Sequence, residues 1–143
     1  MLNMLSCAHR MGTIRVWSVR TGEEAMSLLY DGDVNTQSIA ISKGSRWIVS
    51  GSIGRAVRIW DILSGKLVRE LVHCCRNRVC SVAVSNDFRV IASALDERAV
   101  WAWKISEETA SETALRGCAS FVYSVALSSG GSRVASGSDD EAV

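Results

Sequence analysis

Apolar and polar residues alternate along this chain in short runs, and turns rich in Ser, Gly, Lys and Asp separate the runs. This spacing is typical of β-strands, because successive side chains of a strand point to opposite faces. The strongest helical alternative, residues 107–115, is too short and too rich in Thr and Ser to compete. The pattern predicts strands near residues 13–17, 25–29, 36–41, 46–51, 56–61, 66–72, 79–84, 89–94, 99–104, 111–115, 122–127 and 133–137.

Equivalent residues recur every 43 positions along the chain. Trp17, Trp60 and Trp103 each close an apolar run, and one period beyond Val100 lies Val143. Serines follow the same period, in the sets Ser50, Ser93 and Ser136, Ser38, Ser81 and Ser124, and Ser42, Ser85 and Ser128. A period of roughly 40 to 45 residues with a tryptophan at a strand end is typical of four-stranded propeller blades.

One unit of this length buries too little surface to be stable alone, since ordering its backbone costs roughly 1 to 2 kcal/mol per residue. Residues 81–84 and 124–127 are small or apolar almost without interruption. Strands with this pattern are buried on both faces. We therefore expect the units to stack against one another.

Three segments resemble repeats of a known family: RVASGSDD at residues 133–140, VRIWD at 57–61 and SGKL at 64–67. They are similar to blades of the WD-repeat β-propeller family, and the closeness of the copies is similar to the WD arrays of NACHT-type signalling proteins. The resemblance covers nearly the whole chain. It implies an all-β fold, a partial WD-repeat β-propeller of about three blades' worth of four-stranded antiparallel sheets. It also implies a non-enzymatic scaffold that holds other proteins.

We expect a single partial propeller over residues 1–143. Residues 1–31 would supply the outer strands of a first partial blade, 32–74 and 75–117 would be repeat units, and 118–143 an incomplete repeat. The predicted strands number twelve, whereas closed propellers need about 4 to 8 blades. Two explanations stay open: a truncated product or piece of a longer array, or a head-to-tail homodimer completing a six-bladed ring in which each composite blade takes two strands from each chain.

The chain departs from the family pattern at several polar positions. In the family, a His, a tight-turn Asp, a strand Ser or Thr and the Trp form a buried hydrogen-bonded set. The resemblance implies that Trp17, Trp60, Trp103, Ser50, Ser93 and Ser136 are structural repeat positions. The His position reads Gly32, Cys75 and Cys118, so no copy has the histidine there. The tight-turn Asp is kept at Asp140 but replaced by Glu97 one period earlier, and the final Asp of the motif is kept at Asp61. We expect blades of below-average stability.

Composition supports an ordinary globular protein with 48% apolar and 22% charged residues. A formal charge of +1 gives no electrostatic reason to expect nucleic acid or an anionic membrane surface as partner. No apolar run approaches the roughly 20 residues that cross a bilayer, and no signal peptide is evident at the start. Five cysteines, an odd number, suit a reducing compartment, so we expect thiols and an intracellular location, cytoplasmic or nuclear.

Residues for catalysis or metal binding are few. His73 and Cys74 would make a poor catalytic pair, because neighbours on a strand point to opposite faces. We expect them instead in a solvent-exposed loop. The cysteines beside them lack the paired spacing of a zinc site, and residues 139–141 read as a solvated turn. We therefore expect no enzyme activity, no cofactor, no metal and no small-molecule substrate. The alternatives are a decayed or truncated repeat remnant with no dedicated partner, and less favoured, a propeller hydrolase or metal-binding protein.

Candidate contacts with a partner protein follow from residue type. Trp101 stands where the other copies have Arg15 and Arg58, and Trp47 opens a strand. Tryptophan and arginine are enriched in binding hot spots. Packing between blades is the alternative role for Trp47 and Trp101.

Overall fold

The computed structural model describes residues 4–8, 13–29, 35–73, 78–118 and 120–139, and all the regular structure in them is β-strand. Within these residues there is no helix that could cross a membrane. The strands are five to seven residues long: β1 (Met4–Ala8), β2 (Thr13–Ser18), β3 (Glu24–Leu29), β4 (Thr36–Ile41), β5 (Trp47–Ser52), β6 (Ala56–Asp61), β7 (Lys66–Val72), β8 (Val79–Val84), β9 (Val90–Leu95), β10 (Ala99–Ile105), β11 (Ala110–Arg116), β12 (Val122–Leu127) and β13 (Val134–Ser138).

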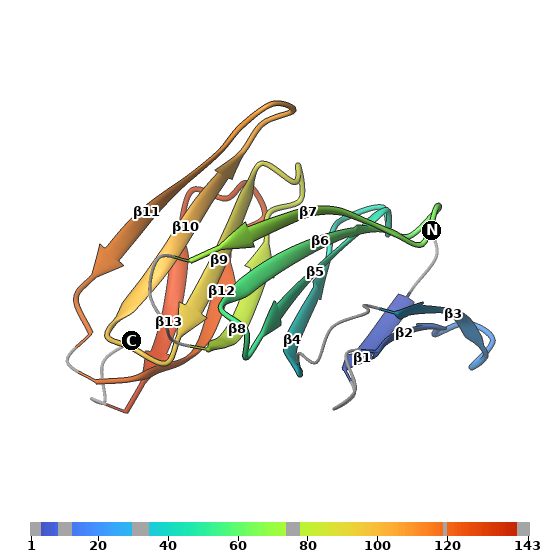
Figure 1. Cartoon of the computed structure of the whole chain (residues 1–143), viewed down its shortest axis with the longest axis horizontal. Coiled ribbons are helices and arrows are strands. Elements are labelled where there is room, and N and C mark those ends of the chain that lie inside the picture. Colours follow the sequence, from blue (N-terminus) through green and yellow to red (C-terminus); the bar gives the residue numbers. More distant parts are fainter. Residues whose placement is uncertain (1–3, 9–12, 30–34, 74–77, 119, 140–143) are drawn as a thin grey trace.

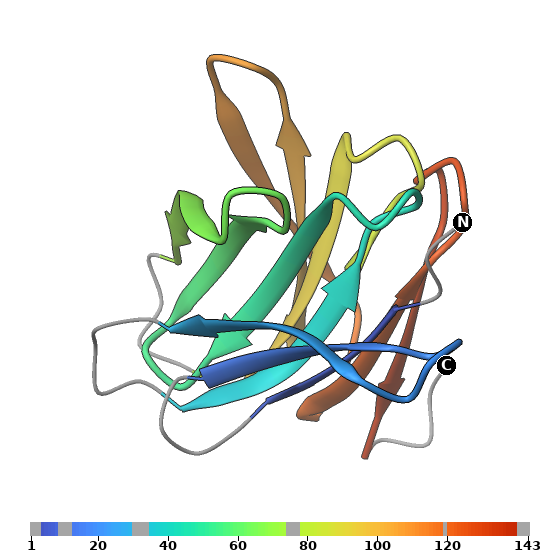
Figure 2. The same cartoon turned by 90° about the vertical axis from the view of Figure 1, so that its right-hand side faces the viewer.

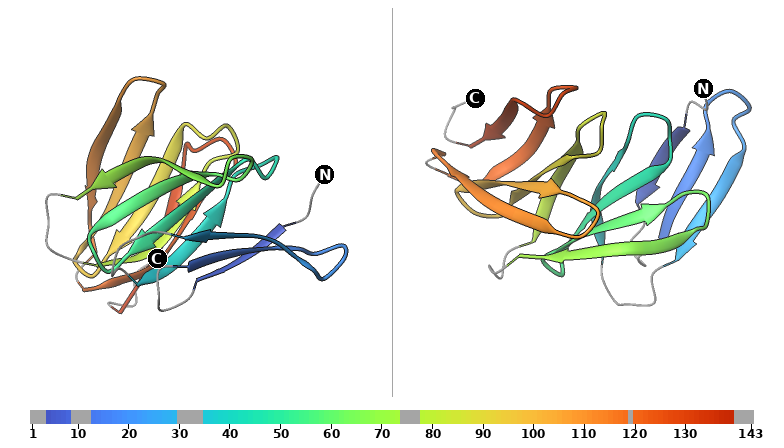
Figure 3. Two further views of the ribbon diagram at one scale, coloured as in Figure 1. Left: turned by 45° about the vertical axis from the view of Figure 1, so that its right-hand side comes forward. Right: turned by 90° about the horizontal axis from the view of Figure 1, so that it is seen from above.

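The strands form four antiparallel sheets in which neighbours in sequence are neighbours in space. The first sheet is β1-β2-β3, the second β4-β5-β6-β7, the third β8-β9-β10-β11 and the fourth β12-β13. Figure 1 labels them, and Figure 3 shows the sheets side by side from the blue first sheet to the red fourth. The predicted all-β architecture with four-stranded antiparallel sheets is confirmed.

The 43-residue period holds in the backbone as well as in the sequence. Strands β4, β8 and β12 begin one period apart, and each pairs with the next strand after a register shift at its second residue. The turns that follow these strands also repeat. The hydroxyl of Ser42 accepts a hydrogen bond from the Trp47 amide at 3.1 Å, and Ser85 and Ser128 do the same one and two periods later, at 3.0 Å each.

The prediction of two strands in the first sheet is wrong. Strand β1 pairs with β2 over five residues, from Met4 opposite Ser18 to Ala8 opposite Ile14. The sheet therefore has three strands, and the described residues hold thirteen strands rather than twelve. Residues 4–8 lie one period before 47–51 in β5, so the repeat itself contained the signal for this strand.

The apolar cores lie between sheets rather than within one. One core joins the first and second sheets around Ile14, Val16 and Ile48, and another joins the third and fourth around Val100 and Val122. The largest lies between the second and third sheets and contains Val49, Val57, Ile59, Val79, Val82, Ile91, Leu95, Trp101 and Trp103. Each sheet is consequently stabilised by its neighbours, as expected for stacked repeat units.

Close approach of the inner strands depends on one glycine. A Cβ atom at Gly51 would lie 2.5 Å from Cγ1 of Val79 and 3.0 Å from Cγ1 of Val82, both on β8. The adjoining hydroxyl of Ser38 accepts a hydrogen bond from the Val82 amide at 3.2 Å. The contact repeats at the next junction, where Ser81 accepts from the amide of Val125 at 3.3 Å. These bonds fix the height of each sheet against the previous one.

The outer hairpin of the third sheet differs from its counterparts. In the first and second sheets the turn contains a glycine at positive φ, Gly22 or Gly65, and a register shift precedes it. In the third sheet the turn closes through Ser106 and Thr109, and β10 pairs with β11 without a register shift. Figure 2 shows this hairpin, in brown, extending beyond the turns of the neighbouring sheets.

Gly51→Ala tests the junction between the second and third sheets. The added methyl group would overlap Val79, so we expect a loss of about 1 to 3 kcal/mol in the free energy of unfolding, measured by urea denaturation. Gly137→Ala is the matched control, because Gly137 lies two periods after Gly51 and its nearest contact would be 3.9 Å away. We expect that variant to stay within about 0.5 kcal/mol of wild type. Equal effects of the two changes would contradict the packing described above.

Candidate functional site

The repeated tryptophans take part in buried hydrogen bonds to the repeated serines. The Trp60 indole nitrogen donates to the Ser50 hydroxyl at 2.9 Å, and the Trp103 indole donates to Ser93 at 3.2 Å. Both rings are at most 5% exposed. Trp17 is half-buried on β2. Such buried polar pairs are worth about 1 kcal/mol each and would cost more if one partner were removed.

His73 supplies a buried histidine, although the residue at the family's histidine position in this repeat is Cys75. The expectation of a solvent-exposed loop is wrong, because His73 is 1% exposed and its ring lies 4.8 Å from that of Trp103 and 5.7 Å from that of Trp101. Its Nε2 atom is 3.2 Å from the Ser93 hydroxyl. The third sheet therefore has a His, Ser and Trp set, with the His two residues before the position expected from the family.

The hydrogen-bond chain indicates the tautomer of this histidine. The Trp103 indole can only donate, so Ser93 accepts from it and has its own hydrogen left for Nε2 of His73. The ring proton then lies on Nδ1, which is 3.5 Å from a carboxylate oxygen of Glu112 but makes no hydrogen bond. Burial lowers the pKa of His73 to about 4, against a smaller raising effect from the charge of Glu97. Burial also raises the pKa of Glu112.

The other polar repeat positions are structural or lie outside the described residues. Glu97 accepts a hydrogen bond from the Trp101 indole at 2.8 Å, and Asp61 accepts one from the Leu63 amide at 2.9 Å. The Ser136 hydroxyl is 3.8 Å from the sulfur of Cys118, which stands at the expected histidine position. The final structural position, Asp140, falls outside the residues that the structure describes, as do Gly32 and Cys75.

Two of the four candidate contact residues are buried, which corrects the prediction that they face a partner. Trp101 is 7% exposed and packs in the core between the second and third sheets. Arg58 is 6% exposed, and its Nε atom donates to Glu70 at 2.6 Å while Nη1 donates to Ser52 at 3.2 Å. Both lie on the third strand of a four-stranded sheet that is covered on both sides. Arg15 remains accessible, with its guanidinium 4.0 Å from Glu24.

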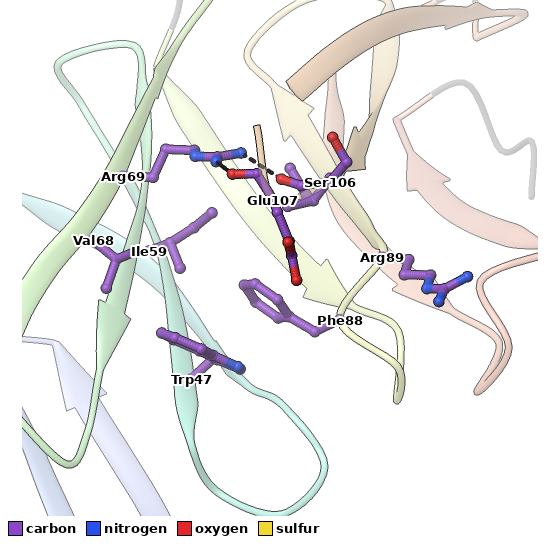
Figure 4. A pocket seen from close by; sticks show the side chains of 9 residues that line it. Trp47, Ile59, Val68, Arg69, Phe88, Arg89, Ser106 and Glu107 are labelled. Carbon is purple, nitrogen blue, oxygen red and sulfur yellow. Dashed lines mark hydrogen bonds between the residues drawn. The ribbon is translucent and has the colours of Figure 1, made fainter. Parts of the chain in front are cut away.

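The fourth candidate, Trp47, lines a cavity of about 690 Å³ between the outer parts of the second and third sheets. We call it the inter-sheet cavity. Its wall is apolar and aromatic, and Figure 4 shows Trp47 beside Phe88, with Ile59 and Val68 across from them. The Trp47 and Phe88 rings stack with centroids 5.3 Å apart and planes 21° apart. The guanidinium of Arg46 lies 4.7 Å from the Trp47 centroid, a cation–π contact.

Arg69 fixes the far wall of the inter-sheet cavity. Its guanidinium donates to three backbone carbonyls of the β10–β11 turn, those of Ser106 at 3.2 Å, Glu107 at 2.9 Å and Thr109 at 3.3 Å. Figure 4 shows the first two carbonyls beside it. These three hydrogen bonds, which we call the Arg69 clasp, join β7 to the next sheet and hold the turn over the cavity.

Residue type alone did not identify Phe88, Arg69 or Glu107 as cavity residues. The available signal was departure from the repeat. Phe88 adopts φ of 60°, as Gly131 does at 70° in the next copy and Ser45 at 55° in the previous copy, so the bulk of its side chain is what departs from the repeat. A bulky residue in this region is strained. Phe88 is therefore held in its position by the surrounding structure.

The described part of the chain contains no group of three His, Cys, Asp or Glu side chains arranged to hold a metal ion. Cys80 and Cys118 are free thiols. Burial raises the pKa of Cys80, so this thiol is a weaker nucleophile than an ordinary cysteine at neutral pH. The geometry around His73 favours structure over chemistry, because the residue is 1% exposed and its ring packs against Trp101 and Trp103.

His73→Gln tests the buried network through pH. In the unfolded chain the pKa is near 6.5 and in the folded chain about 4, so the unfolded state binds more protons between these values. The stabilisation that comes from the lowered pKa of His73 is therefore fully present above pH 6.5. About 3 kcal/mol of it is lost as the pH falls toward 4. The raised pKa of Glu112 acts in the opposite sense. We expect urea unfolding to show a smaller loss for His73→Gln than for wild type between pH 7 and pH 4; parallel profiles would contradict a neutral buried His73.

Comparison with protein-family models identifies the repeat. The family described as WD domain, G-beta repeat matches residues 29–61, which contain β4, β5 and β6, and residues 110–143, which contain β11, β12 and β13. No curated protein matches the chain. Together with the sheets and the Trp–Ser pairs, these two matches support the assignment of the chain to the WD-repeat family.

Proposed function

We propose that this chain is a non-enzymatic protein-interaction scaffold and that its partner protein binds at the inter-sheet cavity. WD repeats generally mediate contacts between proteins and generally have no catalytic role. The observation that carries the proposal is the Trp47–Phe88 stack, which lines an open cavity large enough for side chains of a partner.

Ring contacts and hydrogen bonds within the chain hold the cavity wall in place. Phe88 stacks on Trp47, the Arg46 guanidinium also lies against the indole, and Arg69 holds the overlying turn through three carbonyls. A preformed site loses little conformational entropy on binding. Phe88 shares its positive φ with Ser45 and Gly131 at the same position of the other copies, so the repeated turn fixes the direction in which its ring leaves the backbone.

The mouth of the cavity is partly apolar. Val68 lines the cavity on β7 and is 52% exposed. An exposed apolar side chain beside an aromatic cavity is typical of a protein-binding surface. The alternative, a decayed remnant without a dedicated partner, would leave this exposed side chain without a role.

A second candidate function is self-association through the fourth sheet. Ser124 and Gly137 lie two periods after Ser38 and two periods after Gly51, the residues that receive the next inner strand within the chain. Ser124 is exposed, and among the described residues only Ser124 lies within 4 Å of a Cβ at Gly137. This face thus has the chemistry of an internal junction. In a head-to-tail ring, β12 and β13 would form one composite blade with the first sheet of a second copy. A blade has four strands, whereas these sheets supply two and three, so either β1 or β13 would have to leave the composite blade.

Val68→Asn tests the first proposal. A buried amide without a hydrogen-bond partner costs about 1 to 3 kcal/mol, so this change at the mouth of the cavity should weaken partner capture about tenfold. Leu63→Asn is the matched control, because Leu63 is 78% exposed and does not line the cavity. The measurement is quantitative affinity capture from cell extract with wild type and both variants, after circular dichroism confirms folding. A protein retained by Leu63→Asn and lost with Val68→Asn is the expected result; no enriched protein, or equal loss with both, contradicts the proposal and favours the remnant.

Native mass spectrometry at micromolar protein tests self-association. The ring requires a species of twice 15.5 kDa, and Gly137→Val should remove it, because the new side chain occupies the space that an incoming strand needs. Thermal unfolding of the variant at a concentration where wild type is monomeric controls for misfolding. A wild-type chain that stays monomeric rules out the ring.

A further inference from the structure

The inter-sheet cavity combines an aromatic and aliphatic wall with one inward-pointing negative charge. Figure 4 shows the side chain of Glu107 extending into the cavity toward the ring of Phe88. No cation of the described residues pairs with this carboxylate. A carboxylate beside aromatic and aliphatic groups is complementary to a long side chain with a cationic end.

Two arginines also line the cavity, so the directions of their side chains matter. The guanidinium of Arg69 directs three of its five N–H donors to carbonyls of the β10–β11 turn. Figure 4 shows the guanidinium of Arg89 pointing away from the cavity. The Glu107 carboxylate is therefore the charged group that extends into the space beside Phe88.

We propose that the inter-sheet cavity receives a lysine or arginine side chain of the partner protein. This inference rests on the proposed function and adds the chemistry of the partner. The aliphatic stem lies along Ile59 and Val68, and the cationic end lies between the Phe88 ring and the Glu107 carboxylate. Long basic side chains can bury their methylene groups against an apolar wall in this way while their charge stays paired.

The experiment uses four small probes and the nuclear magnetic resonance signal of the Trp47 indole N–H in the intact chain. The probes are n-butylguanidinium, n-butylammonium, 1-hexanol and hexanoate. Trp60, Trp101 and Trp103 donate their indole hydrogens inside the fold, so their signals serve as internal references. We expect both cations to shift the Trp47 signal with dissociation constants on the order of millimolar, and hexanoate to leave it unchanged.

Glu107→Gln should weaken binding of both cations roughly fivefold, as expected for a partly exposed ion pair. Glu108→Gln is the matched control, because the adjacent carboxylate does not line the cavity. Equal effects of the two changes, or binding of hexanoate at least as strong as that of the cations, overturn the inference. Binding of hexanol that is stronger than that of the cations and unaffected by Glu107→Gln also overturns it, because the anchor would then be apolar.

These outcomes are separable from failure of the proposed function. A cavity that binds hexanol or hexanoate leaves partner binding in place and changes only the chemistry of its anchor. A cavity that binds none of the probes overturns the basic anchor, whereas the comparison of Val68→Asn with Leu63→Asn still decides whether a protein binds there.

Discussion

Contact between neighbouring inner strands is the constraint on which the rest of this structure depends. The absence of a side chain at Gly51 lets Val79 and Val82 approach, and the Ser38 hydroxyl sets the height of that approach. Because every apolar core lies between two sheets, loss of this contact would expose both faces at once. Radially arranged sheets that are close at their inner strands diverge at their outer strands, as Figure 3 shows. The inter-sheet cavity lies in that outer space, between β7 and the β10–β11 turn.

Most of the fold could be predicted from periodicity, because one unit repeated in sequence must repeat in space when each copy packs on the next. Twelve of the thirteen strands follow from alternation of apolar residues and the 43-residue period. Strand β1 was missed because residues 4–8 neither alternate clearly nor end in tryptophan. The 43-residue period carried a signal for this strand that was not used, since residues 4–8 lie one repeat before β5. Pairing with β2 stabilises this strand where its own pattern is weak.

The site was harder to predict, since the roles of its residues depend on the neighbouring sheet. His73 precedes the family position by two residues, yet the end of β7 brings it against Ser93 and Trp103 of the next sheet. Arg58 and Trp101 have the residue types of binding hot spots, but they occupy a strand covered on both faces. Arg58 is satisfied there by Glu70 and Ser52. Residue type indicates contact energy, whereas position in the sheet decides which atoms can be contacted.

Departures from the repeat gather around the inter-sheet cavity, and this distribution argues that the cavity is more than a packing gap. Phe88 stands where another copy has glycine, and Glu107 stands where the second copy has Ser64 of the Ser-Gly turn. Loss of that glycine removes the register shift of the outer hairpin, which extends the turn so that Arg69 can bind its carbonyls. A gap left by imperfect packing would need neither an aromatic side chain at Phe88 nor the hydrogen bonds of Arg69. Here the Phe88 ring and the Arg69 hydrogen bonds line one space that stays open between sheets that are otherwise in contact.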